Sequence, residues 1–290
     1  MRDYVIITDT NSDLPKQYVK EHNLLLIPQY TTLDGVTYEG AEGIEPSEFY
    51  RKMREGSVPQ SQAINPAVVE ETFRSILSQG NDILYISFSS TLSSSYEVAV
   101  MVAKQLEEEF PESQIRVIDS MNVSLSEGLL VHKAWKKKQE GASLDENVQW
   151  LEENKMHVCV KFTVDDLHHL QRGGRVSKTT AVVGSILNIK PMMILDNNGQ
   201  LKPVGTVRTR KKALMALVDY MGEKISGWEE ENEIVGIVHG DCLDDARFVA
   251  EQVKEKYHIP EVMINDINPS IGVHAGPGAL GLLFFGSGRE

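Results

Sequence analysis

Short hydrophobic stretches alternate along the first half of the chain with longer stretches whose apolar residues recur at helical spacing. Compact runs rich in β-branched residues predict strands over Tyr4–Thr8, Leu24–Tyr30, Ile83–Ser87 and Ile115–Ile118. Helices are predicted over Pro46–Arg54, Ser124–Lys138 and Leu144–Asn154. Two further helices are predicted, one that begins at Pro66 and one that ends at about Phe110. This alternation indicates an α/β domain over 1–155 with a doubly wound, mostly parallel sheet.

The second half repeats the alternation with one hairpin added. Asn197-Asn198-Gly199 is typical of a tight hairpin turn. Strands are predicted over His157–Thr163, Met192–Leu195, Leu201–Val207, Ile234–His239 and Val262–Ile267. Helices are predicted over Asp165–Leu170 and Ala213–Met221, and a third helix follows the strand Ile234–His239 and ends at about Lys256. We expect a second α/β domain over 156–290 with a mixed sheet and a glycine-rich tail.

Composition and charge narrow the class of protein. Hydrophobic residues make up 41% of the 290 residues, which is ordinary for a globular chain. The net charge of −13 argues against nucleic-acid binding, which needs clustered cations. No stretch approaches ~18 consecutive apolar residues, so we expect no membrane span, and acidic residues near Met1 argue against a signal peptide. Cys159 and Cys242 are expected to be reduced thiols of a cytoplasmic protein.

Two groups of serine residues lie close to the predicted ends of strands. Ser61 sits in a predicted loop just before Asn65, and Ser93 and Ser94 follow the strand at Ile83–Ser87. Ligands of open α/β sheets bind outside the carboxyl ends of the strands, where free N–H groups also gather. Hydroxyl groups at such a place suit a singly charged anion such as a carboxylate. The alternative is that these serines only cap helices.

Arg175 and His274 are two further candidates. Arg175 ends the turn Arg172-Gly173-Gly174-Arg175, whose two guanidinium groups suit an anion; a helix end with solvated arginines is the alternative. His274 opens a predicted loop, His274-Ala275-Gly276-Pro277-Gly278, and supplies a donor that titrates near neutral pH; a structural hydrogen bond is the alternative. The same glycines match G-x-G-x-x-G, but no βαβ unit follows them, which excludes a dinucleotide fingerprint.

Metal and phosphate chemistry has weaker support in the sequence. Asp9 and Asp13 follow the first strand and suit Mg²⁺, although the pattern favours capping of the helix at Pro15. The chain contains no G-x-x-x-x-G-K-[ST], H-E-x-x-H or G-x-S-x-G motif. We therefore expect neither a metal ion nor another cofactor.

Seven segments, spread over nearly the whole chain, carry a recognisable ordered pattern. They are Thr8-Asp9-Thr10…Asp13-Leu14-Pro15, Ser61-Gln62, Ser89-Ser90-Thr91-Leu92-Ser93-Ser94-Ser95-Tyr96, Asp119-Ser120, Gly173-Gly174-Arg175…Leu187-Asn188-Ile189-Lys190-Pro191, Val207-Arg208-Thr209-Arg210 and His274-Ala275-Gly276-Pro277-Gly278. In this order they resemble the DegV family of fatty-acid-binding proteins, whose segments read TDS…DLP, TSQPSP, SSxLSGTY, DS, GGR…LNIKP, VRTR and HTGPG.

The resemblance implies two α/β domains with a long-chain fatty acid buried between them. It implies that the hydroxyls of Ser61 and Ser93 hold the carboxylate, with the backbone N–H of Ser94 as a helper. It places Arg175 and His274 near the same end. It further implies that the protein is not an enzyme: bacterial members of this kind hand their acid to a separate fatty-acid kinase, which makes an acyl phosphate.

Three residues depart from the family's motifs. Gln60 and Ala63 stand where the family has Thr and Pro, and Ser94 stands where it has the glycine of LSG. A serine at a position that needs positive φ is strained, so a positive φ at Ser94 would change the shape of the carboxylate pocket. We expect these departures to affect ligand preference more than fold.

The alternative function is an enzyme that acts on a small acid or an acyl substrate. Asp9 and Asp13 suit an Mg²⁺-dependent phosphotransferase. Ser93 and His274 suit a hydrolase, provided that they lie within hydrogen-bond reach and a third group orients the histidine.

Overall fold

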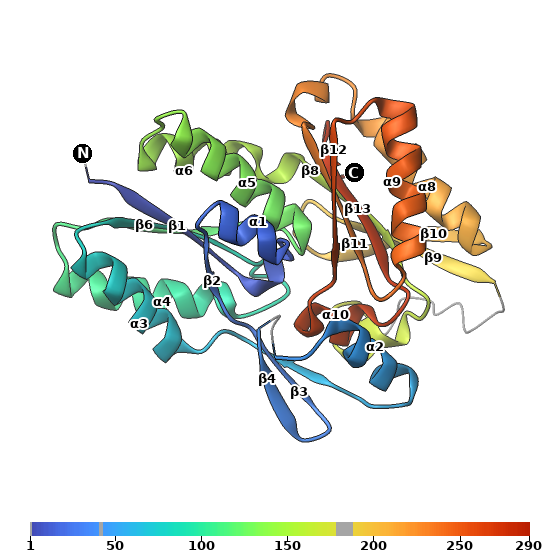
Figure 1. The fold of residues 1–290 in the computed structure, drawn as a ribbon, viewed down its shortest axis with the longest axis horizontal. Helices are drawn as coiled ribbons and strands as arrows, with labels where there is room; N and C mark the ends of the chain where they lie inside the picture. Colours follow the sequence, from blue (N-terminus) through green and yellow to red (C-terminus); the bar gives the residue numbers. More distant parts are fainter. Residues whose placement is uncertain (1, 41–42, 178–187) are drawn as a thin grey trace.

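A four-stranded parallel sheet forms the first half of the protein, in a computed structural model that describes residues 2–40, 43–177 and 188–290 (Figure 1). The strand order is β2-β1-β6-β7. The strands are β1 at Tyr4–Asp9, β2 at Leu25–Ile27, β6 at Asp82–Ser87 and β7 at Ile115–Asp119. All three pairings are parallel, which confirms the predicted architecture of this half.

Helices cover both faces of this sheet because its strands are apolar on both sides. Successive residues of a strand point to opposite faces. Ile7 therefore packs with α3 and α4, whereas Ile6 packs with α5. The helices are α3 at Pro66–Ser78 and α4 at Ser95–Glu109 on one side, and α5 at Leu125–Gln139 and α6 at Leu144–Asn154 on the other.

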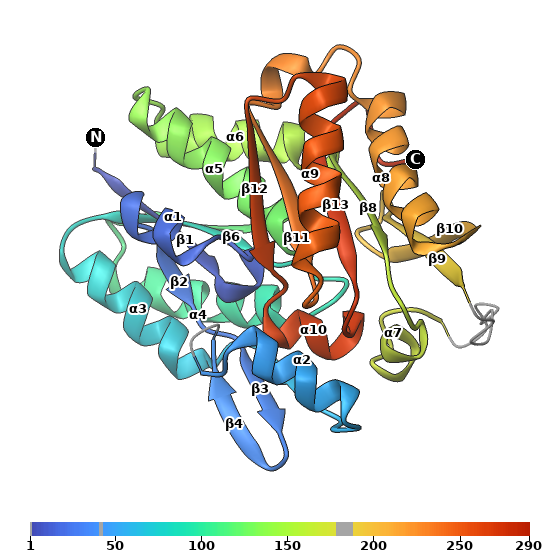
Figure 2. The same cartoon turned by 45° about the vertical axis from the view of Figure 1, so that its right-hand side comes forward.

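The second sheet has six strands in the order β10-β9-β8-β13-β11-β12. Only β11 and β12 pair in parallel, so the sheet is mixed, as expected. Its strands are β8 at Val158–Thr163, β9 at Ile189–Leu195, β10 at Leu201–Arg208, β11 at Ile234–His239, β12 at Glu261–Asp266 and β13 at Leu280–Phe285. Two helices, α8 at Arg210–Lys224 and α9 at Leu243–Tyr257, cover its outer face (Figure 2).

Helix α5 lies between the two sheets and belongs to both. It contacts β1 and β6 of the parallel sheet and β8, β11 and β13 of the mixed sheet. Ten consecutive residues, from Leu125 to Ala134, are buried. A helix that is buried on every side needs partners all round, and here the two sheets supply them. The halves of the chain therefore share one central helical layer.

A small sheet and four short helices complete the described structure. The sheet is antiparallel in the order β4-β3-β5. Its strands are β3 at Tyr30–Leu33, β4 at Val36–Glu39 and β5 at Gln60–Gln62, and the helices are α1 at Lys16–Glu21, α2 at Pro46–Arg54, α7 at His168–Arg172 and α10 at Pro269–Ala275.

Three sequence-based expectations are wrong. The strand expected over Leu24–Tyr30 is divided, because β2 ends at Ile27 and β3 joins the small sheet. Ser61 lies in the strand β5, whose partner is β3, and not in a loop. The glycine-rich tail contains α10, which carries His274, and β13, a strand with neighbours on both sides. Each error involves pairing between distant segments, which local patterns do not encode.

The predicted domain boundary near residue 156 stays a prediction. The strands of the parallel sheet all precede Ser120 and those of the mixed sheet all follow His157, yet one hydrophobic core contains residues from both halves. None of the helices in the described part of the chain combines the length and apolar character needed to cross a bilayer.

Arg289 ties the two halves together from a fully buried position. Its guanidinium donates to the carbonyl oxygens of Val158, Asp196 and Lys155 at 3.0–3.1 Å and to Oδ1 of Asn122 at 2.9 Å. Burial lowers the pKa of this group to about 10. The carbonyl oxygens of Asp196 and Lys155 also accept from Gly199 N–H and Asn122 Nδ2, so the loss of Arg289 mainly deprives Val158 and Asn122 Oδ1 of a donor.

We expect Arg289→Met to lower the free energy of unfolding by about 3 kcal/mol, since unpaired buried acceptors cost more than the added apolar side chain returns. Urea denaturation measures the change. Arg247→Met is the matched control: Arg247 is exposed and, among the described residues, pairs only with Asp244 of its own helix, so its loss should cost less than about 0.5 kcal/mol. Equal losses in the free energy of unfolding for the two variants would contradict the role of Arg289 in joining the two halves.

Candidate functional site

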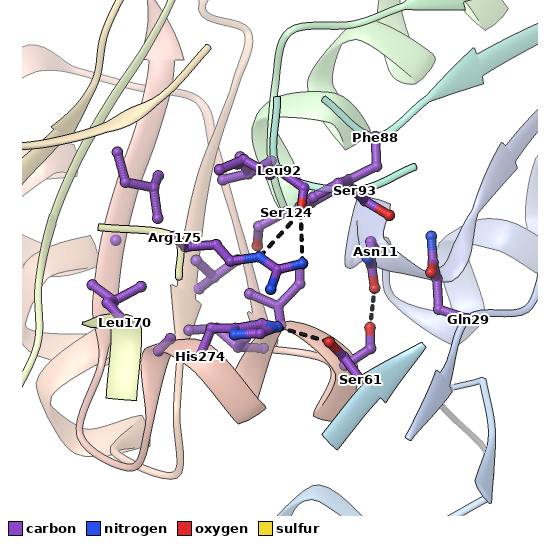
Figure 3. Close-up of a pocket in the computed structure, with 18 of the residues that line it drawn as sticks. Asn11, Gln29, Ser61, Phe88, Leu92, Ser93, Ser124, Leu170, Arg175 and His274 are labelled. Carbon is purple, nitrogen blue, oxygen red and sulfur yellow. Dashed lines mark hydrogen bonds between the residues drawn. The ribbon is translucent and has the colours of Figure 1, made fainter. Parts of the chain in front are cut away.

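A cavity of about 160 Å³ lies between the mixed sheet and the carboxyl ends of the parallel strands (Figure 3). Asn11, Phe88 and Val123, which follow β1, β6 and β7, line one side of it. Most of the remaining wall is apolar: Leu92, Val160, Phe162, Leu170, Leu201, Val238, Ile267, Ile271, Leu280 and Leu283. The volume is many times what one buried water needs, so the two halves are not packed solidly against each other here.

The structure brings all five predicted site residues to this cavity. They come from four separate elements and are Ser61, Ser93, Ser94, Arg175 and His274. The most distant in sequence are in direct contact: Ser61 Oγ lies 2.7 Å from His274 Nε2, across 213 positions of the chain. Their role as ligands of a carboxylate stays a prediction.

The surroundings of His274 favour one nitrogen of the imidazole as the site of its proton. Nδ1 of His274 is buried and has no hydrogen-bond partner among the described residues. A buried N–H without a partner is rarer than an unused acceptor, which favours the tautomer with the proton on Nε2. In that tautomer His274 donates to Ser61, and the Ser61 hydroxyl proton is free to point into the cavity.

Gly173 explains why the imidazole sits in this position. A Cβ at Gly173 would lie 2.0 Å from Nδ1 of His274, so only a glycine allows α7 and α10 to approach this closely. Burial, followed by the charges of Arg175 and Arg172, lowers the pKa of His274 to about 4. The imidazole is therefore neutral at physiological pH and acts as a hydrogen-bond donor rather than a cation.

Ser93 has its hydroxyl proton free for a similar reason. Ser95 Oγ accepts from Gln29 Nε2 at 3.0 Å and from the backbone N–H of Ile64 at 3.4 Å. Its own proton is then left to donate to Ser93 Oγ, 2.9 Å away. Ser93 also accepts from the backbone N–H of Ser95, as a capping residue does. With its oxygen occupied by these donors, Ser93 has one O–H to offer a ligand.

Ser94 begins α4 without capping it and without strain. Its φ of −80° is ordinary, so the loss of the family's glycine does not distort the turn. Its hydroxyl makes no capping hydrogen bond. Nor does Ser61 cap a helix, because Asn65 caps α3 through the backbone N–H of Ala67. The simple capping interpretation is thus wrong for Ser61 and Ser94 and holds in part for Ser93.

Arg175 positions the turn that carries Ser93. Its Nε and Nη2 donate to the carbonyl oxygen of Leu92 at 3.1 and 2.9 Å, and Nη1 donates to the carbonyl oxygen of Gly173 at 2.5 Å. Burial lowers the pKa of the guanidinium, which still leaves it charged at neutral pH. Arg175 therefore joins the Leu92 turn to the glycine turn and brings a positive charge to the cavity.

Four further polar residues of the wall were missed by sequence reasoning: Asn11, Gln29, Ser124 and Ser270. Ser270 Oγ donates to Asn11 Oδ1, which joins the end of β1 to α10. Gln29 supports Ser95, as described above. Their only local signal is position after a strand or at the start of a helix, and many residues share that signal.

The aspartates considered for Mg²⁺ are committed to structural hydrogen bonds. Asp9 is buried, caps the 3₁₀ turn Thr10–Ser12, and accepts from Tyr85 Oη and the backbone N–H of Phe88. Asp13 accepts from Ser124 and from the backbone N–H of Asn268. Capping of the helix after Pro15 is also wrong, since that helix has no side-chain cap. Within the described ranges, no group of three or more His, Cys, Asp or Glu side chains could hold a metal ion.

The pair proposed for a hydrolase does not form in this arrangement. In the described structure Ser93 bonds to Ser95 and His274 bonds to Ser61. No described group orients Nδ1 of His274. Ser61 and His274 lie within hydrogen-bond reach of each other, but the described structure lacks the third group that orients the histidine of a catalytic serine.

Comparison with known proteins places this arrangement in a family. A family model described as "Uncharacterised protein, DegV family" matches residues 3–287. The chain belongs to the DegV family. A DegV domain-containing protein from Clostridium perfringens is 38% identical to it over 100% of both chains. Another from Caldanaerobacter subterraneus subsp. tengcongensis is 32% identical over 98% of this chain and 99% of the relative.

Solved structures of DegV proteins have the same fold. A fatty-acid-binding DegV family protein from Thermus thermophilus superposes with a TM-score of 0.86, at 27% identity over 99% of this chain and 100% of that one. DegV from Bacillus subtilis, also described as a fatty-acid-binding protein, superposes with a TM-score of 0.85, at 26% identity over the same shares. These likenesses extend over both halves of the chain.

We expect the contribution of His274 to stability to be lost as pH drops from about 6.5 to about 4, because this residue resists protonation in the folded state. At this position the unfolded chain binds the proton more readily in this window, so acid favours unfolding through His274 by on the order of 3 kcal/mol. His274→Gln keeps a side-chain N–H donor and does not titrate. Urea denaturation across this pH window should therefore give a shallower slope for His274→Gln than for the native chain; parallel slopes would contradict a low pKa of His274.

Proposed function

We propose that this protein binds a long-chain fatty acid, with its tail in the apolar cavity and its carboxylate at Ser61, Ser93 and the backbone N–H of Ser94. The proposal rests on the hydroxyls of Ser61 and Ser93. The oxygen of each already accepts a hydrogen bond from the protein, so each O–H is left to donate to a ligand, and both lie beside a cavity with an apolar wall. Such a wall suits a hydrocarbon chain, and the pair suits a singly charged acid.

Burial of the tail provides the driving force. Each buried methylene contributes about 0.8 kcal/mol, so some fourteen methylenes contribute on the order of 11 kcal/mol before ordering costs. The net charge of −13 does not attract an anionic lipid over a distance. Apolar contacts with residues such as Val160, Leu170 and Leu283 must therefore drive uptake.

The carboxylate needs hydrogen bonds in place of the water that it leaves. In the proposed complex Ser61 and Ser93 each donate one O–H to it. His274 supports Ser61 through Nε2–H, and Ser95 supports Ser93 in the same way. The guanidinium of Arg175 stabilises the negative charge from the side of the Leu92 turn. No described carboxylate takes part in this network, which suits an anionic ligand.

The relatives support the same ligand class. The Thermus thermophilus and Bacillus subtilis proteins, each described as fatty acid binding, match this chain over nearly its whole length. Their shared fold makes a comparable cavity the simplest expectation for this chain.

We further propose that the protein is a carrier that presents the carboxylate to a separate fatty-acid kinase for acyl-phosphate formation. Ser94 is exposed and Ser61 and Ser93 are half-buried, whereas Leu92 and Val160 of the cavity wall are buried. The head group would then lie near the surface while the tail stays inside. The two cysteines are free thiols, in keeping with a cytoplasmic site for this exchange.

Solvent extraction of the purified protein followed by mass spectrometry should release close to one long acyl chain per polypeptide. Ser93→Ala and Ser61→Ala should each weaken fatty-acid binding by about 1–3 kcal/mol, since each removes one partner of a buried carboxylate. Ser143→Ala is the control: Ser143 caps α6 on the surface, so its loss lowers stability by about 1 kcal/mol and leaves binding unchanged. Native protein that neither carries nor takes up an acyl chain would refute the proposal.

The carrier role has its own test. Loaded protein, ATP and a bacterial fatty-acid kinase should together yield acyl phosphate, whereas the loaded protein with ATP alone should yield none. Ser61→Ala, loaded to the same extent, should slow the reaction because the carboxylate is no longer held in place. Acyl-phosphate formation or acyl-ester hydrolysis by this protein without a kinase would instead favour the enzyme alternative.

A further inference from the structure

One glycine of the cavity wall lies in the middle of the mixed sheet. Gly281 on β13 pairs with Val238 of β11 on one side and Phe162 of β8 on the other, and all three residues line the cavity. Its φ lies outside the positive range that favours glycine. The backbone would accept any residue here, so the need for glycine must come from the space above the strand.

That space faces the cavity. Side chains alternate along β13: Leu282 and Phe284 pack into the core beneath α8 and α9, whereas Leu283 and Phe285 belong to the core on the opposite face. Gly281 lies two residues before Leu283, so the two positions point to the same face of the sheet. A side chain at position 281 would therefore project from the face that bears the cavity.

A second glycine on the same face, Gly236, allows a helix to pack closely against the sheet. Gly236 of β11 pairs with Leu283, one row away from Gly281. A Cβ at Gly236 would lie 3.1 Å from Cβ of Leu125, the first residue of α5. The glycine thus lets the central helix approach the sheet, and the side chain of Leu125 occupies the gap.

No such neighbour covers Gly281. A Cβ built there would have as its three nearest atoms Cγ2 of Val238 at 3.3 Å, Cβ of Phe162 at 3.4 Å and Cδ1 of Leu283 at 3.8 Å, so Val238 and Phe162 would have to shift by a few tenths of an ångström to admit it. All three belong to the mixed sheet itself and all are carbons. Helix α5 begins beside Gly236 and supplies none of these three atoms, and Gly281 itself lines the cavity. Its apolar surroundings suit a hydrocarbon chain rather than a charged group.

We propose that Gly281 sets the length of acyl chain that the protein accepts, an inference that rests on the proposed function. The acyl chain crosses the mixed sheet over Gly281, between the side chains of Phe162 and Val238, in the space that a side chain at 281 would fill. Glycine weakens a strand, so its use in a central strand indicates that something must approach the backbone closely. A larger residue would shorten the room left for the tail.

The test is a competition between two acids. Native protein and the variants Gly281→Ala and Gly281→Leu are exchanged against an equimolar mixture of octadecanoic and tetradecanoic acid, repurified, and their bound acids measured by mass spectrometry. Gly281→Leu should lower the ratio of long to short acid at least about ten-fold, since one methylene in an apolar pocket already changes discrimination by about that factor. Gly281→Ala should shift the ratio in the same direction by less.

Gly236→Ala is the matched control. It adds the same methyl group to the same face of the sheet, but against Leu125 and not in the cavity. It should lower the thermal midpoint and leave the ratio of the two acids within two-fold of the native value. A shift as large as that of Gly281→Ala would overturn the assignment, because general loosening of the sheet would then explain both.

The outcomes separate this inference from the function on which it rests. Native protein that retains neither acid refutes fatty-acid binding itself. Native protein that retains them, with an unchanged ratio in folded Gly281→Ala and Gly281→Leu, refutes only the role of Gly281. If Gly281→Leu does not fold, Gly281→Ala decides alone, and an unchanged ratio again counts against the proposal.

Discussion

The single helix α5, buried between two sheets, is the constraint on which the rest of the structure depends. Each sheet has an apolar face that must be covered, and one helix covers both. The helix begins at Leu125 and does not extend over the cavity, whose wall there is completed by the short helices α7 and α10. The cavity lies there, lined by Val123 and Ser124 just before the helix and by β8, β11 and β13 opposite. The point at which the helix begins therefore determines where the cavity lies.

The chemistry of the site follows from donor and acceptor counts rather than from charge. His274 and Ser95 each give a proton to a serine oxygen, so that Ser61 and Ser93 keep theirs for a ligand. The low pKa of His274 keeps this arrangement in place at neutral pH. Gly173 admits the imidazole at the required distance. A set of neutral donors at the cavity is thereby organised by hydrogen bonds with His274 and Ser95.

The alternation of strands and helices, the mixed second sheet and five of the residues that line the cavity were predictable from the sequence. Local patterns located β1, β6 and β11, and the ordered motifs brought together Ser61, Ser93 and His274. What could not be predicted is pairing over distance: the strand β5 under Ser61, and the contact of Ser61 with His274, 213 residues apart. The supporting role of Ser95 was equally hidden, because it depends on two donors from other segments.

The place of β13 has a consequence for how the protein is made. This strand lies between β8 and β11, yet it comes after both, and after β12, in the order of synthesis. The mixed sheet consequently stays in two separate pieces on the ribosome until residues 280–285 emerge, and α10 with His274 precedes them by only a few residues. Nascent chains therefore expose apolar sheet edges from the synthesis of β8 until β13 emerges, when chaperones are best placed to protect them, and the wall of the cavity is completed in one late step.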